Sequence, residues 1–152
     1  MAYDFTTKSW ADVQPTNPEL SVPLDSHCAL IWEKDAENTS MIVVGGFIGG
    51  NVGDYSNAVL EYNLEQNTWT TLFKNKIIET EKASQKLGVP QGRVGMGACI
   101  NQNNLYIFGG NEGNTKFNDL WKFDLINKTW SFIKPTGTLI PEVINFILIQ
   151  PI

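Results

Sequence analysis

Few residues in this sequence have the chemistry of a catalytic or metal-binding site. The chain contains one histidine, His27, and two cysteines, Cys28 and Cys99. A histidine acts as a general base when a carboxylate orients it, and no motif in the sequence supplies a carboxylate for His27. Two cysteines are too few for a disulfide framework or a closed zinc site. Both lie in apolar surroundings, so we expect buried, reduced thiols.

Motifs for nucleophilic catalysis, metal binding and phosphate binding are also absent from the sequence. Gly45-Gly46 and Gly49-Gly50 are glycine pairs, but neither precedes the Gly-Lys-Ser/Thr of a phosphate-binding loop. We therefore predict no catalytic residue, no bound metal and no cofactor in this chain.

The overall composition indicates a globular protein rather than a disordered one. Of the 152 residues, 42% are hydrophobic and 18% are charged. The net charge of -5 gives the chain no electrostatic attraction to nucleic acid or to anionic lipid. The N-terminus lacks a secretory pattern, and no apolar run approaches the roughly 20 residues that span a bilayer. We predict a cytoplasmic protein that binds neither nucleic acid nor membranes.

Three segments of the chain, residues 3–10, 62–69 and 123–130, repeat the same pattern. An aromatic residue is followed by Asp or Asn, and a tryptophan stands seven positions after the aromatic. The aromatic residues are Tyr3, Tyr62 and Phe123, and the tryptophans are Trp10, Trp69 and Trp130. Successive copies are about 60 residues apart, which is the spacing of a repeat architecture. These side chains most simply pack one repeat against the next.

Each complete repeat contains further segments with the pattern of β-strands. Residues 41–46 and 105–110 are short apolar runs that end in two glycines, Gly45 and Gly46 or Gly109 and Gly110. Paired glycines allow positive φ and let neighbouring chains come close. Residues 57–62 and 118–123 read as a third strand, and an Asx-rich turn precedes a fourth at the tryptophan. The repeat is therefore predicted to be a four-stranded antiparallel meander in an all-β fold.

This combination resembles the kelch motif, whose repeats are the blades of β-propellers. Kelch blades usually open with Pro-x-x-Arg-x-Gly-His-Ser-Ala. Here residues 90–98 keep the Pro and Arg93 but have Met96 in place of the His, and residues 23–29 keep His27 but lack the Arg. The resemblance covers residues 1 to about 140 and implies a partial kelch-type β-propeller of four-stranded antiparallel blades. A period longer than the usual ~50 residues places the additional residues in loops.

The repeats divide the chain into four parts. Residues 1–14 are predicted to be the last two strands of a preceding blade, and residues 15–73 and 74–135 to be two blades, the second with a long leading loop. Residues 136–152 are a divergent apolar tail. A propeller closes with about four to eight blades, so this chain cannot close a ring alone. It is a truncated or mis-spliced product, one chain of an assembly, or a chain whose tail is a divergent inner strand; we favour truncation. We expect self-association or a need for further blades.

Loop-borne function is expected at one end of the blades. The loops from strand two to strand three, 47–56 and 111–117, emerge at the same end as the links 14–25 and 74–92. Within the second link, residues 76–88 are either a short helix ended by Gly88 or a solvated loop. The candidate partner-binding residues at this end are Asn51, Asp54, Tyr55, Arg93, Glu112, Asn114 and Lys116.

Arg93 has two alternative roles. In the kelch family, the Arg that opens the inner strand often lines the central pocket and contacts acidic partner residues, so the resemblance implies this role for Arg93. The alternative is that Arg93 bonds loop carbonyls or a carboxylate of a neighbouring blade.

The function predicted is that of a non-catalytic module that binds a protein partner through the loops of one propeller face. One alternative is a fragment of a kelch-type enzyme, such as a metal-dependent oxidase, an epimerase or a specifier protein, with its site on other blades. Copper radical oxidation needs two histidines, and this chain has one. A second alternative is a structural subunit of a larger assembly.

Overall fold

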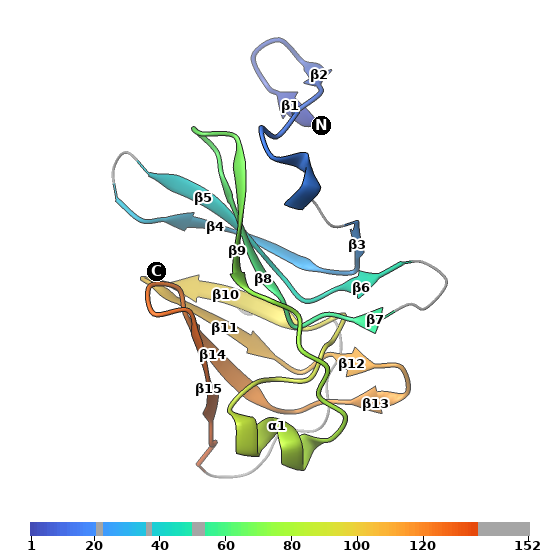
Figure 1. Ribbon diagram of the computed structural model, residues 1–152. Coiled ribbons are helices and arrows are strands. Elements are labelled where there is room, and N and C mark those ends of the chain that lie inside the picture. Colours follow the sequence, from blue (N-terminus) through green and yellow to red (C-terminus); the bar gives the residue numbers. More distant parts are fainter. Residues whose placement is uncertain (21–22, 36–37, 50–53, 137–152) are drawn as a thin grey trace.

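Two four-stranded antiparallel sheets form the body of the molecule (Figure 1). The computed structural model describes residues 1–20, 23–35, 38–49 and 54–136. The first sheet consists of β4 (Cys28–Glu33), β5 (Thr39–Val44), β8 (Val59–Asn63) and β9 (Thr68–Phe73). The second consists of β10 (Gly97–Asn101), β11 (Asn104–Phe108), β14 (Leu120–Asp124) and β15 (Thr129–Ile133). Each sheet is ordered as its strands follow in the chain, which confirms the predicted four-stranded antiparallel meanders.

Shorter strands and helices precede the two sheets or lie in their connections. The N-terminal hairpin consists of β1 (Ala2–Asp4) and β2 (Ser9–Ala11). A small sheet combines β3 (Leu24–Asp25), β6 (Phe47–Ile48) and β7 (Asp54–Tyr55), and a hairpin combines β12 (Asn111–Glu112) and β13 (Thr115–Lys116). The 3-10 helix Pro18–Leu20 and the α-helix α1 (Glu81–Leu87) lie in the two links. The segments predicted as loops between strands two and three thus contain short paired strands of their own.

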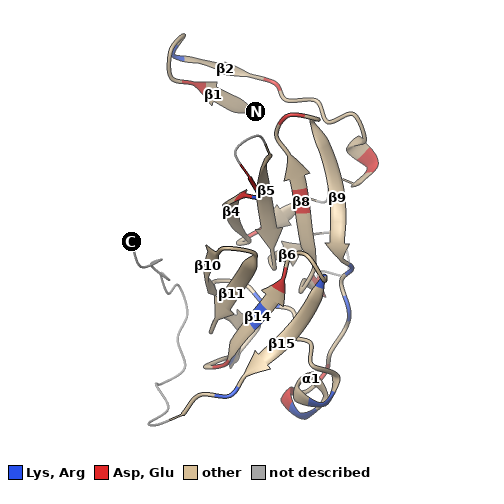
Figure 2. Ribbon diagram, turned by 90° about the vertical axis from the view of Figure 1, so that its left-hand side faces the viewer, with Lys and Arg blue, Asp and Glu red and all other residues tan. Residues whose placement is uncertain are grey.

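The hydrophobic core lies between the two sheets, which Figure 2 shows one above the other. The first sheet contributes Trp32, Ile42, Val44, Val59 and Leu72, and the second contributes Ile100, Leu105, Ile107, Trp121 and Phe123. In β14 buried side chains alternate with half-buried ones, because successive residues of a strand point to opposite faces. The central strand β8 is buried on both faces, from Val59 to Tyr62. Polar contacts cross the same boundary: the indole Nε1 of Trp32 donates to the side-chain Oδ1 of Asn103 at 3.2 Å. The two repeats therefore pack as one body.

The turn before the last strand is built in the same way in all three copies. The side-chain Oδ1 of Asp4, Asn63 or Asp124 accepts hydrogen bonds from the backbone N–H groups two and three residues later. These bonds also lower the pKa of the Asp4 and Asp124 carboxyls. Each turn then places one residue at positive φ, between 54° and 57°, namely Lys8, Asn67 or Lys128. The predicted Asx turns are present.

These turns bring the repeated aromatic residue opposite the tryptophan across two strands. The ring centroids are 5.2 Å apart for Tyr3 and Trp10, 4.9 Å for Tyr62 and Trp69, and 5.0 Å for Phe123 and Trp130. The sequence repeat is therefore a repeat of one cross-strand aromatic pair.

Part of the second link is helical. The side-chain hydroxyl of Thr80 accepts from the backbone N–H of Ala83 at 3.2 Å and caps the start of α1. Gly88 ends the helix at φ 64°, as predicted from its position. The helix is shorter than the segment 76–88, because it begins at the Thr80 cap; Lys76, upstream of the cap, is hydrogen-bonded to Asn57.

Asn57 makes that attachment and holds the long link in place. Its side chain accepts from the backbone N–H of Lys76 at 2.8 Å and donates to the carbonyls of Lys76 and Pro90 at 2.7 Å and 2.8 Å. Asn57 is only 2% exposed, so these groups have little access to water.

We expect Asn57→Ala to lower the free energy of unfolding by about 1–3 kcal/mol, because it leaves buried backbone groups without partners. Urea denaturation measures the effect. Asn114→Ala, at an exposed turn, is the matched control and is expected to change stability by less than about 0.5 kcal/mol. Equal stability of the two variants would contradict the role given to Asn57.

Candidate partner-binding face

The hairpins β6–β7 and β12–β13 project from the same side of the molecule (Figure 1). The start of the second repeat joins them. The backbone N–H of Arg93 donates to the carbonyl of Ser56 at 3.0 Å, and the carbonyl of Arg93 accepts from Gly46 at 2.9 Å. The next residue, Val94, exchanges two backbone hydrogen bonds with Asn111, of 3.0 Å and 2.9 Å. One short segment is thus bonded to the first repeat and, one residue later, to the hairpin of the second.

Gly92 allows this close approach. A Cβ atom at Gly92 would lie 1.9 Å from the carbonyl oxygen of Tyr55 and 3.1 Å from the backbone nitrogen of Ser56. Only a residue without a side chain fits against the end of β7. The link and the loop that bears Asp54 and Tyr55 are therefore held at a fixed distance.

The first glycine pair lies at the same boundary between the two repeats. A Cβ at Gly45 would lie 2.3 Å from the terminal methyl carbon of Met96 and 2.9 Å from the carbonyl oxygen of Arg93. Gly45 and Gly46 have φ of 67° and 100°, and Gly109 and Gly110 have φ of 65° and 87°. The first pair lets the opening of the second repeat pack against the end of β5.

The side chain of Arg93 is buried, with 1% of its surface exposed. Its guanidinium donates Nη1 to Oδ1 and Nη2 to Oδ2 of Asp119, at 2.5 Å and 2.9 Å. Nη1 also donates to the carbonyl of Gly109 at 3.0 Å, and Nε donates to that of Gln91 at 3.1 Å. The guanidinium carbon lies 4.2 Å from the ring centre of Phe117.

This geometry does not fit a contact of Arg93 with a partner's acidic residue. The guanidinium is occupied by Asp119 and two carbonyls, so the alternative role, in which Arg93 bonds loop carbonyls and a carboxylate, is the one that the structure displays. The carboxylate belongs to the same repeat rather than to a neighbouring blade. Arg93 thus positions the loops of the face but is not on its surface.

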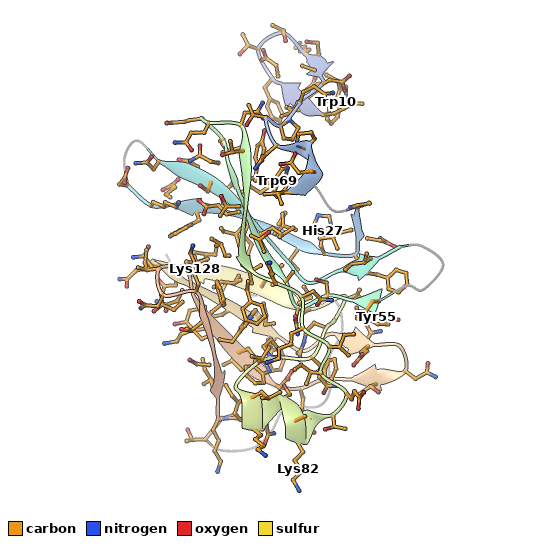
Figure 3. The ribbon with its side chains drawn as sticks, viewed as in Figure 1. Trp10, His27, Tyr55, Trp69, Lys82 and Lys128 are labelled. Atoms are coloured by element: carbon orange, nitrogen blue, oxygen red, sulfur yellow. The ribbon has the colours of Figure 1, made fainter. Side chains whose placement is uncertain are left out.

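The accessible part of the face combines aromatic and acidic side chains. Phe47 and Tyr55 pack edge to face across β6 and β7, with ring centres 5.2 Å apart, and Figure 3 shows Tyr55 at this side of the molecule. Glu112 lies beside them and accepts from the side-chain nitrogen of buried Gln91 at 3.1 Å. Desolvation raises the pKa of Glu112, and the negative charge of Asp54 raises it further. The acidic residues of two successive repeats are therefore close together.

The remaining predicted residues extend this surface. Asn114 and Lys116 are exposed on the β12–β13 hairpin. Asn51 lies outside the described residues. We define the loop face as Phe47, Asp54, Tyr55, Glu112, Asn114 and Lys116. Phe47, Gln91 and Gly92 are not among the residues predicted to bind a partner, although Phe47 lies in the predicted loop 47–56 and the other two lie in the Pro-Gln-Gly-Arg stretch of the motif.

The histidine and the two cysteines do not form a second site among the described residues. The ring nitrogen Nδ1 of His27 lies 3.2 Å from the carbonyl oxygen of Leu24. Cys28 and Cys99 are free thiols that are half-buried rather than buried, and desolvation raises the pKa of both. Among the described residues, no three His, Cys, Asp or Glu side chains are grouped as they would be around a metal ion. The helical segments in this part of the chain include none with the length and apolarity needed to cross a membrane.

Four-stranded antiparallel meanders that follow one another in the chain and pack face to face, with loops at one end, are typical of the blades of a β-propeller. The model of the KLHDC2/KLHL20/DRC7 Kelch-repeats domain matches residues 1–145, so the chain belongs to the kelch-repeat family. Kelch repeats generally mediate protein–protein interaction.

Individual relatives agree with this assignment. Kelch domain-containing protein 10 of Homo sapiens is 27% identical over 94% of this chain, and its Xenopus tropicalis counterpart is 28% identical over 94%. Kelch domain-containing protein 3 of Bos taurus is 43% identical over 32% of the chain and 13% of its own length. The chain spans only 29% and 31% of the two Kelch domain-containing protein 10 sequences.

Proposed function

We propose that this chain binds a protein partner through the loop face. The observation that carries the proposal is that Gly92, Arg93 and Val94 fix two hairpins from successive repeats side by side. A partner therefore meets one prearranged surface instead of two independent loops, which reduces the conformational entropy lost on binding.

The composition of the loop face supports the same function. Aromatic side chains such as Tyr55 contribute large contact areas in interfaces, and flanking charges such as Glu112 and Lys116 set specificity and the rate of association. The rigid support below them is the ion pair of Arg93 with Asp119.

The combined substitution of Tyr55→Ala, Glu112→Lys and Lys116→Glu tests the proposal. We expect it to reduce recovery of the bound partner at least about tenfold in a quantitative pull-down, because it removes an aromatic anchor and inverts two charges. The side chains are exposed or half-buried, so the variant should fold, which circular dichroism checks.

The matched control carries Glu65→Lys, Ile126→Ala and Lys128→Glu, three exposed residues in the turns at the other end of the blades. Its partner recovery should equal that of the unmodified chain. Equal losses in the two variants, or no loss in the first, would count against the loop face.

A further inference from the structure

The loop face brings two carboxylates from successive repeats within electrostatic reach of each other. Asp54 belongs to β7 of the first repeat, and Glu112 belongs to β12 of the second. Desolvation raises the pKa of the Glu112 carboxyl, and the negative charge of Asp54 raises it further. Both residues are half-buried, so water screens their repulsion less than it would at a fully exposed position. This arrangement favours a ligand that brings the opposite charge.

The cations of the chain itself do not neutralise these two carboxylates. In the described part of the chain, neither Asp54 nor Glu112 forms an ion pair. The charge of Arg93 lowers the pKa of Glu112, but its guanidinium is bonded to Asp119 and is buried. The register pairs Glu112 with the residue before Lys116, so the Glu112 and Lys116 side chains point to opposite sides of the hairpin. A compensating cation must therefore come from the partner.

A buried glutamine fixes the position of one of the two carboxylates. Gln91 is 5% exposed, and its side-chain nitrogen donates to Oε2 of Glu112 at 3.1 Å. This bond leaves Oε1 of Glu112 able to accept a hydrogen bond from a partner. A carboxylate that is oriented before binding loses less conformational entropy when the partner arrives.

Aromatic rings lie beside the carboxylates. The ring of Tyr55 packs edge to face on that of Phe47, with centres 5.2 Å apart. The hydroxyl oxygen of Tyr55 lies 4.0 Å from the position that a Cβ at Gly113 would occupy. The Tyr55 side chain therefore extends from the first repeat to the turn that follows Glu112. The faces of such rings attract cations, and their carbon atoms pack on aliphatic chains.

We propose that the partner segment bound at the loop face presents a lysine or arginine side chain, whose cation lies between Asp54 and Glu112 beside the ring of Tyr55. This inference rests on the proposed function, because it names the chemistry of the partner that the loop face binds. The basic group supplies the charge that the chain lacks at this place, and its aliphatic part packs on the rings. Acidic segments are disfavoured, since like charges across an interface repel.

A random peptide library displayed on phage and selected on the whole chain tests this chemistry. We expect the selected peptides to share a lysine or arginine at one position. The variant Asp54→Asn with Glu112→Gln should bind them at least about tenfold more weakly in fluorescence anisotropy, because it removes both charges and keeps the side-chain shapes. The matched control Glu65→Gln with Glu79→Gln removes two exposed charges elsewhere and should bind normally.

A double-mutant cycle tests whether the shared basic residue meets the two carboxylates. Replacing that residue of a selected peptide with glutamine should weaken binding to the unmodified chain and have little further effect on the Asp54→Asn with Glu112→Gln variant. Additive effects, or selected peptides without a shared basic residue, would overturn this inference; the loop face would still stand if Tyr55→Ala weakened their binding. If Tyr55→Ala weakened the binding of no selected peptide, the proposed function would fail together with this inference.

Discussion

Replacing Arg93 with alanine is expected to lower the free energy of unfolding by about 3–5 kcal/mol, the usual effect of removing one partner of a buried ion pair. The substitution leaves the carboxylate of Asp119, whose side chain is 14% exposed, without its bidentate partner. It also removes the donors to the carbonyls of Gln91 and Gly109. A domain of ordinary stability has about 5–15 kcal/mol in total, so the loss is a large part of it. Urea denaturation at neutral pH measures the change.

Two further variants separate the ion pair from a general effect of lost charge. Lys116→Ala removes an exposed cation from the same face and should change stability by no more than about 0.5 kcal/mol. The double variant Arg93→Ala with Asp119→Ala should be more stable than the sum of the two single losses predicts, because the residues interact directly. Additive losses, or a loss below about 1 kcal/mol for Arg93→Ala, would contradict this account.

Gly92→Ala is expected to be the second most damaging substitution, with a loss of about 3 kcal/mol, at the upper end for an overpacked site. The new methyl group would meet the backbone of Tyr55 and Ser56 rather than the flexible end of a side chain, so the chain itself must shift. Because that shift moves β7 away from the link, partner recovery through the loop face should also fall, by about tenfold.

Gly49→Ala provides the matched control for Gly92. No atom lies within 4 Å of the position that a Cβ at Gly49 would occupy, and the residue is exposed in the loop after β6. Thermal unfolding and the pull-down should therefore give the same values for Gly49→Ala as for the unmodified chain. If Gly92→Ala behaved in the same way as Gly49→Ala, the close approach of link and loop would be disproved.

The parts of the fold that follow from local patterns were predictable from the sequence. The strands that end at Gly45-Gly46 and Gly109-Gly110 depend on apolar runs and on the ability of glycine to adopt positive φ. The apolar runs and the glycine pairs can both be recognised in the sequence. The Asx turns that begin at Asp4, Asn63 and Asp124 depend on one side chain and the backbone two and three residues later. These features were correctly expected.

The contacts that build the site join residues that are far apart in the chain, and the local pattern does not contain that information. The partner of Arg93 is 26 residues away, and the close approach of Gly92 to Tyr55 joins two repeats. One signal for the ion pair was present. The first repeat lacks the Arg of the motif and has Ala58 where the second has Asp119, so the two charges occur together or not at all.

The backbone bonds of Arg93 and Val94 also determine how this architecture can be divided. The segment 91–94 precedes the second sheet in the chain, yet the backbone of Arg93 is hydrogen-bonded to Gly46 and Ser56, which lie in the first repeat between β5 and β8. A unit that contains the second sheet would therefore also include a backbone segment that is hydrogen-bonded to the neighbouring repeat. A single blade grafted between kelch proteins is therefore better cut in the link around α1, upstream of residues 91–94. The blade that receives it needs a glycine pair equivalent to Gly45 and Gly46, against which those residues pack.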